Sequence, residues 1–190
     1  MKQAGEKSPG GMAAILGLEI NHLEEICAAA SDDSEVVQIA NDNCPGQVVI
    51  SGAEPALERA MQAAQDGGAR KVVRLAVSIA AHSPLMVYAQ EEFTKSVAST
   101  NVKTPLTPVI GNVNAIPLVS VEDIQSDLRA QLNNRVRWTE SIQYLLSAGI
   151  DTFIEIGNNS VLTGLLKRID RSAKGISIST PDDLQKISSL

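Results

Sequence analysis

The sequence predicts a mixed α/β protein that consists of a small ferredoxin-like unit and a second, incomplete layer of helices and strands. Residues 12–77 show the order strand, helix, strand, strand, helix, strand. The residues after 80 alternate between helical and extended patterns, which is typical of part of a larger α/β layer structure. With 44% apolar and 20% charged residues, the chain of 190 residues can bury a core.

Composition excludes several classes of protein. The net charge is −6 and five residues are aromatic, whereas a nucleic-acid binder needs a basic face and stacking rings. No apolar run approaches the roughly 20 residues that span a bilayer, and the N-terminus carries no apolar segment of a secretory signal. We therefore expect a cytoplasmic protein that binds neither nucleic acid nor membrane.

Cys27 and Cys44 have no Cys/His cluster around them, so we expect reduced thiols and no metal site.

The first strand and helix follow a short polar segment. Residues 1–11 contain glycine and proline and are expected to form a flexible lead-in. An apolar run bounded by glycine predicts a buried strand over 12–18. Asn21 can cap a helix over 22–31, whose apolar residues recur with a helical period.

The next elements complete the small unit. Strands are predicted over 36–40 and 47–52, and the dense turn 41–46 between them favours an antiparallel hairpin. Glu54 and Pro55 begin a helix that ends at glycines, and a fourth strand follows at 71–77.

The remaining chain is expected to form helices and a few short strands. Ser83 can cap a helix that begins at Pro84 and runs to about residue 99. The other predicted elements are a strand at 108–113, helices at 121–132 and 136–148, a strand at 152–157, a helix at 160–169 and a strand at 176–178. Three short strands are few for such a sheet, so we expect its other strands to lie outside this chain.

His82 is the side chain whose position suggests chemistry. It lies between the strand at 71–77 and a helix N-terminus, where α/β folds place functional groups, and an imidazole there can act as a general base. It could equally be a capping or core residue. His22 is expected on the surface. The chain has no Gly-x-Ser-x-Gly elbow and no Gly-rich phosphate loop, so the residues alone offer a possible base and no nucleophile.

Five stretches, in order, resemble one family of enzymes. They are GMAAILGL (11–18), NDNCPGQVVISG (41–52), VSIAAHSPLM (77–86), QL with VRW (131–138) and EIG with VLTGLLKRI (155–169). Together they resemble the malonyl-CoA:acyl-carrier-protein transacylases and the acyltransferase domains of fatty-acid and polyketide synthases, from Met1 to about Ile169.

The resemblance implies both a fold and a reaction. In this family a ferredoxin-like subdomain, here 12–78, is inserted into an α/β hydrolase-like subdomain, here 79–190. A serine takes the malonyl group from malonyl-CoA and passes it to the phosphopantetheine thiol of acyl carrier protein, in fatty-acid biosynthesis and with no cofactor. The serine and the malonyl-binding arginine precede the insertion, so the chain resembles a C-terminal part that needs the missing N-terminal half and is inactive alone.

The resemblance also assigns site residues. His82 matches the general base, and Gln131 matches the residue whose main-chain carbonyl orients that imidazole. Asn41 and Asn43 match paired asparagines that line the cleft for the substrate. Alternatively, Gln131 is a surface residue at a helix end, and the two asparagines only tolerate the backbone angles of a tight turn.

A second hypothesis gives the chain no catalytic role. A ferredoxin-like unit can bind a small ligand or another protein, so an acyltransferase-like fragment could persist as a binding or interaction module.

The residues Ile79–His82 match neither of the family's known tetrapeptides for malonyl or methylmalonyl selection, so the acyl group is left open.

Overall fold

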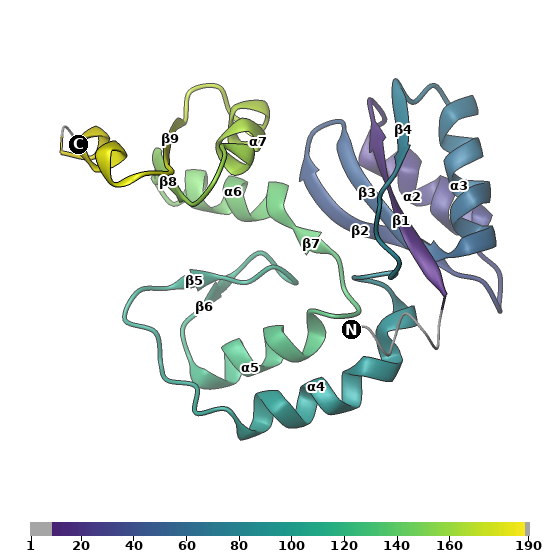
Figure 1. The fold of residues 1–190 in the computed structure, drawn as a ribbon, viewed down its shortest axis with the longest axis horizontal. Helices are drawn as coiled ribbons and strands as arrows, with labels where there is room; N and C mark the ends of the chain where they lie inside the picture. The colour runs from purple at the N-terminus through teal and green to yellow at the C-terminus, as the bar shows by residue number, and fades with distance from the viewer. Residues whose placement is uncertain (1–8, 189–190) are drawn as a thin grey trace.

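The computed structural model describes residues 9–188. Its first part is a sheet in the order β4-β1-β3-β2-β7, with two helices against one face (Figure 1). The edge strand β7 (Val136–Arg137) comes from much later in the chain. In chain order the elements are β1 (Gly10–Leu16), α2 (Ile20–Ala30), β2 (Val37–Cys44), β3 (Gln47–Ala53), α3 (Glu54–Asp66) and β4 (Lys71–Arg74). The pairs β1–β3, β1–β4 and β2–β3 are antiparallel, as the predicted β-α-β-β-α-β order requires.

The main core lies between the two helices and one face of this sheet. Leu23 of α2 and Leu57 of α3 are fully buried there against Ile15 and Ile50 of the strands. Successive strand residues point to opposite faces of a sheet, so Met12, next to the buried Ala13, points away from the main core. On that second face Met12, Ala40 and Val49 form a smaller apolar cluster.

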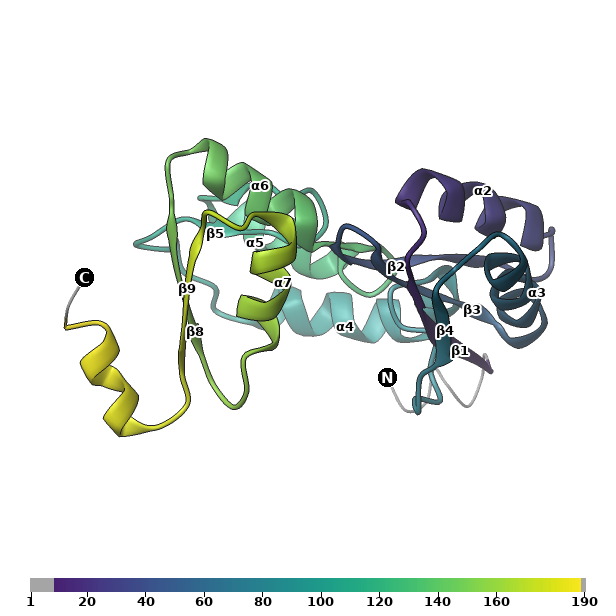
Figure 2. The same cartoon turned by 90° about the horizontal axis from the view of Figure 1, so that it is seen from above.

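The second part of the chain extends to one side of the first sheet and its two helices (Figure 2). Its elements are a 3-10 turn η1 (Pro84–Met86), α4 (Val87–Ser99), β5 (Val109–Ile110), β6 (Pro117–Leu118), α5 (Val121–Ala130), β7 (Val136–Arg137), α6 (Trp138–Ser147), β8 (Thr152–Ile156), α7 (Val161–Ile169), β9 (Lys174–Ile178) and η2 (Pro181–Lys186). Helices α4 and α5 pack together, β5 pairs with β6, and β8 pairs in parallel with β9. Strand β7 joins the first sheet by pairing in parallel with β2.

The structure corrects the predicted turn at 41–46. Strand β2 continues through Cys44, and only Pro45 and Gly46 connect it to β3. The polar residues 41–43 remain in the strand because β2 gains a second partner there, with Asn41 opposite Val136 of β7. The β2–β3 pairing shifts register twice here, between Ile39 and Asn41 and between Asp42 and Cys44, as β-bulges do.

Some predicted boundaries also differ. Helix α2 begins at Ile20 after Glu19, without a side-chain cap, so Asn21 does not cap it. Strand β4 ends at Arg74, although the Leu75 N–H still donates to the Met12 oxygen of β1 over 2.9 Å, and the Leu75 side chain packs on the second face. The predicted lead-in 1–11 lies outside the described residues except for its last three, and β1 already begins at Gly10.

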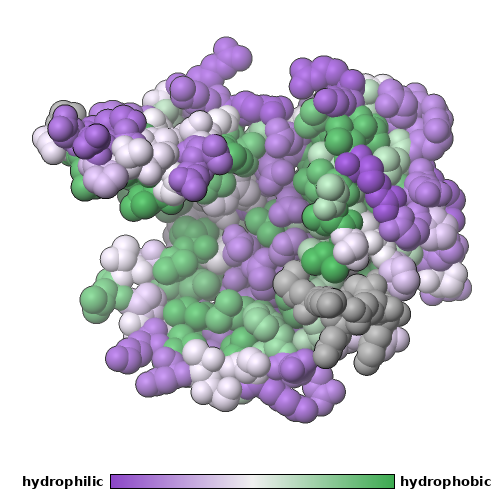
Figure 3. Space-filling view, viewed as in Figure 1, coloured by the Kyte–Doolittle hydropathy of each residue, from purple (hydrophilic) through white to green (hydrophobic). Residues whose placement is uncertain are grey.

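Exposed apolar side chains concentrate in the second part of the chain. Figure 3 shows a hollow in this face of the molecule with apolar side chains along its walls. Of the large apolar side chains that are exposed, Val77 alone precedes residue 84 among the described residues, and Ile156 of β8 is 82% exposed. The exposed large apolar side chains thus lie mostly in the part of the chain that follows residue 84. Within residues 9–188, no helix combines the length and apolar character needed to cross a membrane.

Candidate active site

The segment that carries His82 crosses the second face of the sheet. After β4 the chain packs Leu75 and Ala81 against the Met12 cluster. Ala80 is 2% exposed and lies so close to β1 that a Cβ on Gly10 would be 2.9 Å from its Cβ and 2.5 Å from the Gly52 carbonyl oxygen. The close approach to Gly10 therefore fixes where this segment lies on the sheet.

His82 has a left-handed backbone conformation, with φ of 59°. Such a conformation is uncommon for a residue other than glycine and persists where its surroundings hold it. Ser83 provides part of that hold, because its buried hydroxyl donates to the Ala80 carbonyl over 2.7 Å and accepts from the Leu85 N–H over 3.3 Å. Ser83 thus caps the 3-10 turn η1, which begins at Pro84 as predicted, whereas α4 follows from Val87 without a side-chain cap of its own.

The imidazole of His82 meets the end of α5. Its Nδ1 lies 2.9 Å from the main-chain oxygen of Gln131, the residue that ends this helix. Because a carbonyl oxygen only accepts, this contact requires a proton on Nδ1 and leaves the lone pair of the neutral ring on Nε2. No hydrogen bond to Nε2 is found among the residues that the structure describes. The ring is therefore arranged to accept a proton at Nε2.

Asn112 fixes the side chain of Gln131. Its amide nitrogen donates to Gln131 Oε1 over 3.1 Å, and its main-chain oxygen accepts from the Arg137 N–H over 2.9 Å. The Gln131 Nε2 lies 3.4 Å from His82 Nδ1, farther than the carbonyl oxygen. Asn112 has no sequence signature of its own, and pattern reasoning did not identify it.

Gln38 is a second residue that pattern reasoning missed. It lies in β2, and its Nε2 donates to the His82 carbonyl oxygen over 2.7 Å and to the Asn133 carbonyl oxygen over 3.1 Å. Its only sequence signal is a polar residue between the buried Val37 and Ile39, which places it on the second face of the sheet.

The paired asparagines lie in β2 and not in a turn. Asn41 and Asn43 are both half-buried and flank the buried Asp42. No hydrogen bond joins either side chain to His82 or Gln131 within the described part of the chain. The alternative that they serve tight-turn backbone angles is wrong, because both are strand residues.

Asp42 connects the sheet to α6. Its Oδ1 accepts from the Thr139 hydroxyl over 2.7 Å. Burial raises the pKa of the Asp42 carboxyl above its usual range, although the Thr139 hydrogen bond and the charges of Arg135 and Arg137 act in the opposite direction. Asp42 therefore joins the two parts of the chain through a buried carboxyl group whose ionised form is disfavoured by desolvation.

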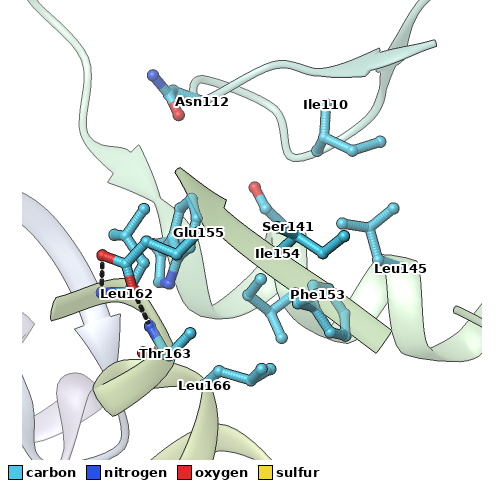
Figure 4. Close-up of a pocket in the computed structure, with 12 residues that line it drawn as sticks. Ile110, Asn112, Ser141, Leu145, Phe153, Ile154, Glu155, Leu162, Thr163 and Leu166 are labelled. Carbon is cyan, nitrogen blue, oxygen red and sulfur yellow. Dashed lines mark hydrogen bonds between the residues drawn. The ribbon is translucent and has the colours of Figure 1, made fainter. Parts of the chain in front are cut away.

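A largely apolar pocket of about 160 Å³ lies beyond Asn112 (Figure 4). It is enclosed by α6, β8, α7 and the chain after β5, and its lining includes Trp138, Phe153 and Leu166. Glu155 points to the start of α7, where its carboxylate accepts from the N–H groups of Leu162 and Thr163 over 2.9 and 2.8 Å. This carboxylate satisfies helix donors and is occupied structurally.

The cysteines and acidic residues offer no further chemistry. Burial, aided by the charge of Glu24, raises the pKa of the Cys27 thiol to about 12, and burial also raises that of Cys44. Such thiols are not reactive nucleophiles. Within the described ranges, no group of three His, Cys, Asp or Glu side chains could hold a metal ion.

Comparison with known proteins places this geometry in a family. Residues 1–180 match the acyl transferase domain family. The malonyl CoA-acyl carrier protein transacylase of Bacillus subtilis (strain 168) is 39% identical over 185 residues, which are 97% of this chain and 58% of that protein.

Solved structures agree with this match. The malonyl-CoA:acyl carrier protein transacylase of Xanthomonas oryzae pv. oryzae aligns with a TM-score of 0.90 at 39% identity, over 97% of this chain and 60% of that one. A malonyl-transacylase in complex with a type II polyketide synthase acyl-carrier protein aligns with a TM-score of 0.92 at 32% identity, over 99% of this chain and 62% of that one. The chain spans less than two thirds of the length of these relatives. Because the family match covers nearly all of its residues, the chain belongs to the acyl transferase domain family.

Proposed function

We propose that this chain supplies the general base and part of the substrate cleft of a malonyl-CoA:acyl-carrier-protein transacylase of fatty-acid biosynthesis, in the cytoplasm. The observation that carries the proposal is the 2.9 Å contact between His82 Nδ1 and the Gln131 carbonyl oxygen. It presents Nε2 as the proton acceptor, and the acyl transfer that relatives are named for needs such an acceptor.

The nucleophile in this proposal is a serine from protein chain outside these 190 residues. His82 Nε2 takes the serine proton while the oxygen attacks the thioester carbon of malonyl-CoA, and the coenzyme A thiol leaves with that proton. The phosphopantetheine thiol of acyl carrier protein then gives its proton to Nε2 and attacks the malonyl ester, and the serine regains a proton. No cofactor is needed, because each step moves only a proton and an acyl group.

Gln131 stabilises the imidazolium that forms at each step without contributing a full charge. Its carbonyl dipole accepts the Nδ1 proton throughout, so the ring stays in one orientation and one tautomer. Asn41 and Asn43 line the cleft in this proposal, at the edge where β2 meets β7. We further propose that residues 12–78 and 79–190 are the two subdomains, with 1–11 as a lead-in.

The test completes the chain with the part of the Bacillus subtilis transacylase that it does not match. The joined protein is mixed with malonyl-CoA, and a malonyl-serine adduct is sought by mass spectrometry before transfer to acyl carrier protein is measured. His82→Ala is expected to lower the transfer rate by about 10²- to 10⁴-fold. The matched control, His22→Ala, changes an exposed histidine of α2 and leaves the rate unchanged.

Two results would contradict the proposal. In the first, the joined protein forms no malonyl-serine adduct. In the second, the joined protein binds acyl carrier protein but transfers no malonyl group to it. The second result favours the alternative that the chain is a non-catalytic interaction module.

A further inference from the structure

We infer that Gln38 is a positioning residue, whose side-chain amide holds the His82 turn and the end of α5 at the separation that the His82–Gln131 contact needs. Gln38 comes from β2, and its side-chain hydrogen bonds go to the main-chain oxygens of His82 and Asn133 and not to the imidazole ring. Its catalytic significance rests on the proposed function, whereas its effect on the imidazole does not.

The two hydrogen bonds of Gln38 use both protons of one amide group. Nε2 lies 2.7 Å from the His82 oxygen and 3.1 Å from the Asn133 oxygen, so each N–H has one carbonyl acceptor. The three segments that meet here are far apart in the chain, because His82 is 44 positions and Asn133 is 95 positions from Gln38. A single side chain therefore joins the two segments that form the histidine–carbonyl pair.

The contacts form a closed ring. Gln38 binds the backbone of His82, the His82 ring binds the backbone of Gln131, and two residues later Asn133 returns to Gln38. Without the amide, the His82 turn and the end of α5 are held together more by the His82–Gln131 hydrogen bond itself. The left-handed turn at His82, with φ of 59°, needs such support from outside its own segment.

The sheet makes Gln38 a firm anchor for both segments. Val37 and Ile39 on either side are buried in the main core, and Gln38 pairs with Ser51 in the β2–β3 ladder. The backbone of Gln38 is thus fixed by the packed core, and its amide extends from the opposite face. A movement of either loop relative to the sheet must break a hydrogen bond at this residue.

The test measures the tautomer of His82 in the 190-residue chain by ¹⁵N NMR of the imidazole nitrogens at alkaline pH. The sequence contains only two histidines, so His22 serves as an internal reference. The parent chain is expected to show the Nδ1–H form for His82. Gln38→Met keeps a side chain of similar length without the donors, and it is expected to raise the ratio of Nε2–H to Nδ1–H about fivefold or more, as loss of one net hydrogen bond would.

Controls separate positioning from stability. Gln62→Met makes the same chemical change on the exposed face of α3, where the amide contacts Asp66, and leaves the His82 tautomer unchanged. Gln38→Asn retains an amide that is too short to reach both carbonyls and is expected to give an intermediate ratio.

The inference is overturned if Gln38→Met folds and keeps the parent tautomer ratio. It is also overturned if Gln38→Met and Gln38→Asn both unfold, because the amide would then hold the whole fold and not this pair. The readout requires no acyl transfer, so a failure of the proposed function, seen as the missing malonyl adduct, is a separate result.

Discussion

The Nδ1 atom of His82 and the main-chain oxygen of Gln131 lie 2.9 Å apart across 49 residues of sequence. The acceptor is a backbone atom, so it is present whatever side chain stands at position 131. A turn on the sheet and the end of α5 must both be correctly placed to form this pair.

Replacement of the Gln131 side chain is therefore expected to have a small effect. Gln131→Ala keeps the carbonyl and loses the hydrogen bond from Asn112 and the long 3.4 Å contact of Nε2 with His82 Nδ1. In the joined enzyme the transfer rate should fall less than about tenfold, which corresponds to one hydrogen bond. Initial rates of malonyl transfer, compared with those of His82→Ala, test this. Equal losses in the two variants would mean that the side chain, and not the carbonyl, orients the ring.

The 190-residue chain alone is expected to transfer no malonyl group. It contains the proposed base but no Gly-x-Ser-x-Gly elbow, so His82 is expected to have no hydroxyl nucleophile to activate. The rate of malonyl-CoA consumption should equal that of buffer, and His82→Ala should leave it unchanged. A clear decrease in that variant would reveal a nucleophile within this chain.

The exposed apolar surface of the second part is expected to promote aggregation. Ile156 is 82% exposed in β8, and Ile156→Ser should reduce the aggregated fraction in light scattering while the free energy of unfolding changes by less than about 0.5 kcal/mol. Val77→Ser is the matched control, because Val77 is exposed but precedes this part of the chain. If both variants, or neither, reduce aggregation, the C-terminal surface is not its cause.

Asp42→Asn is expected to stabilise the chain at neutral pH. Burial raises the pKa of this carboxyl in the folded state, so the folded chain binds more protons than the unfolded chain between the usual value of 3.8 and the raised value. The free energy of unfolding therefore falls as pH rises through that window. Asparagine cannot ionise, and its Oδ1 can still accept from Thr139.

Urea unfolding at neutral and acidic pH tests this expectation. The midpoint of Asp42→Asn should exceed that of the parent chain at pH 7, and the difference should shrink toward pH 4. The control Asp33→Asn removes a charge from an exposed residue and should give no such pattern. A less stable Asp42→Asn at pH 7 would show that the carboxylate is compensated by its arginine neighbours.

Part of the site was accessible from sequence. The position of His82 between a strand and a helix start marked it as a candidate base without any structure. Its partner was not accessible from pattern, because a main-chain carbonyl has no residue signature, and only the family resemblance indicated Gln131. Gln38 and Asn112 were missed for a related reason, since a half-buried amide acts through segments that its own neighbours in sequence do not reveal.

The sequence by itself determined the order of helices and strands over residues 12–77, because apolar periodicity, capping residues and glycine or proline breaks act over a few neighbouring residues. The two-residue strands β6 and β7 were not predicted from it. Only the tertiary structure decided that residues 41–44 continue a strand, since β7 supplies their partner from almost 100 residues away. It also decided the separation of His82 from Gln131. That distance depends on contacts between remote segments, among them the two carbonyls bound by Gln38, and no local pattern encodes them.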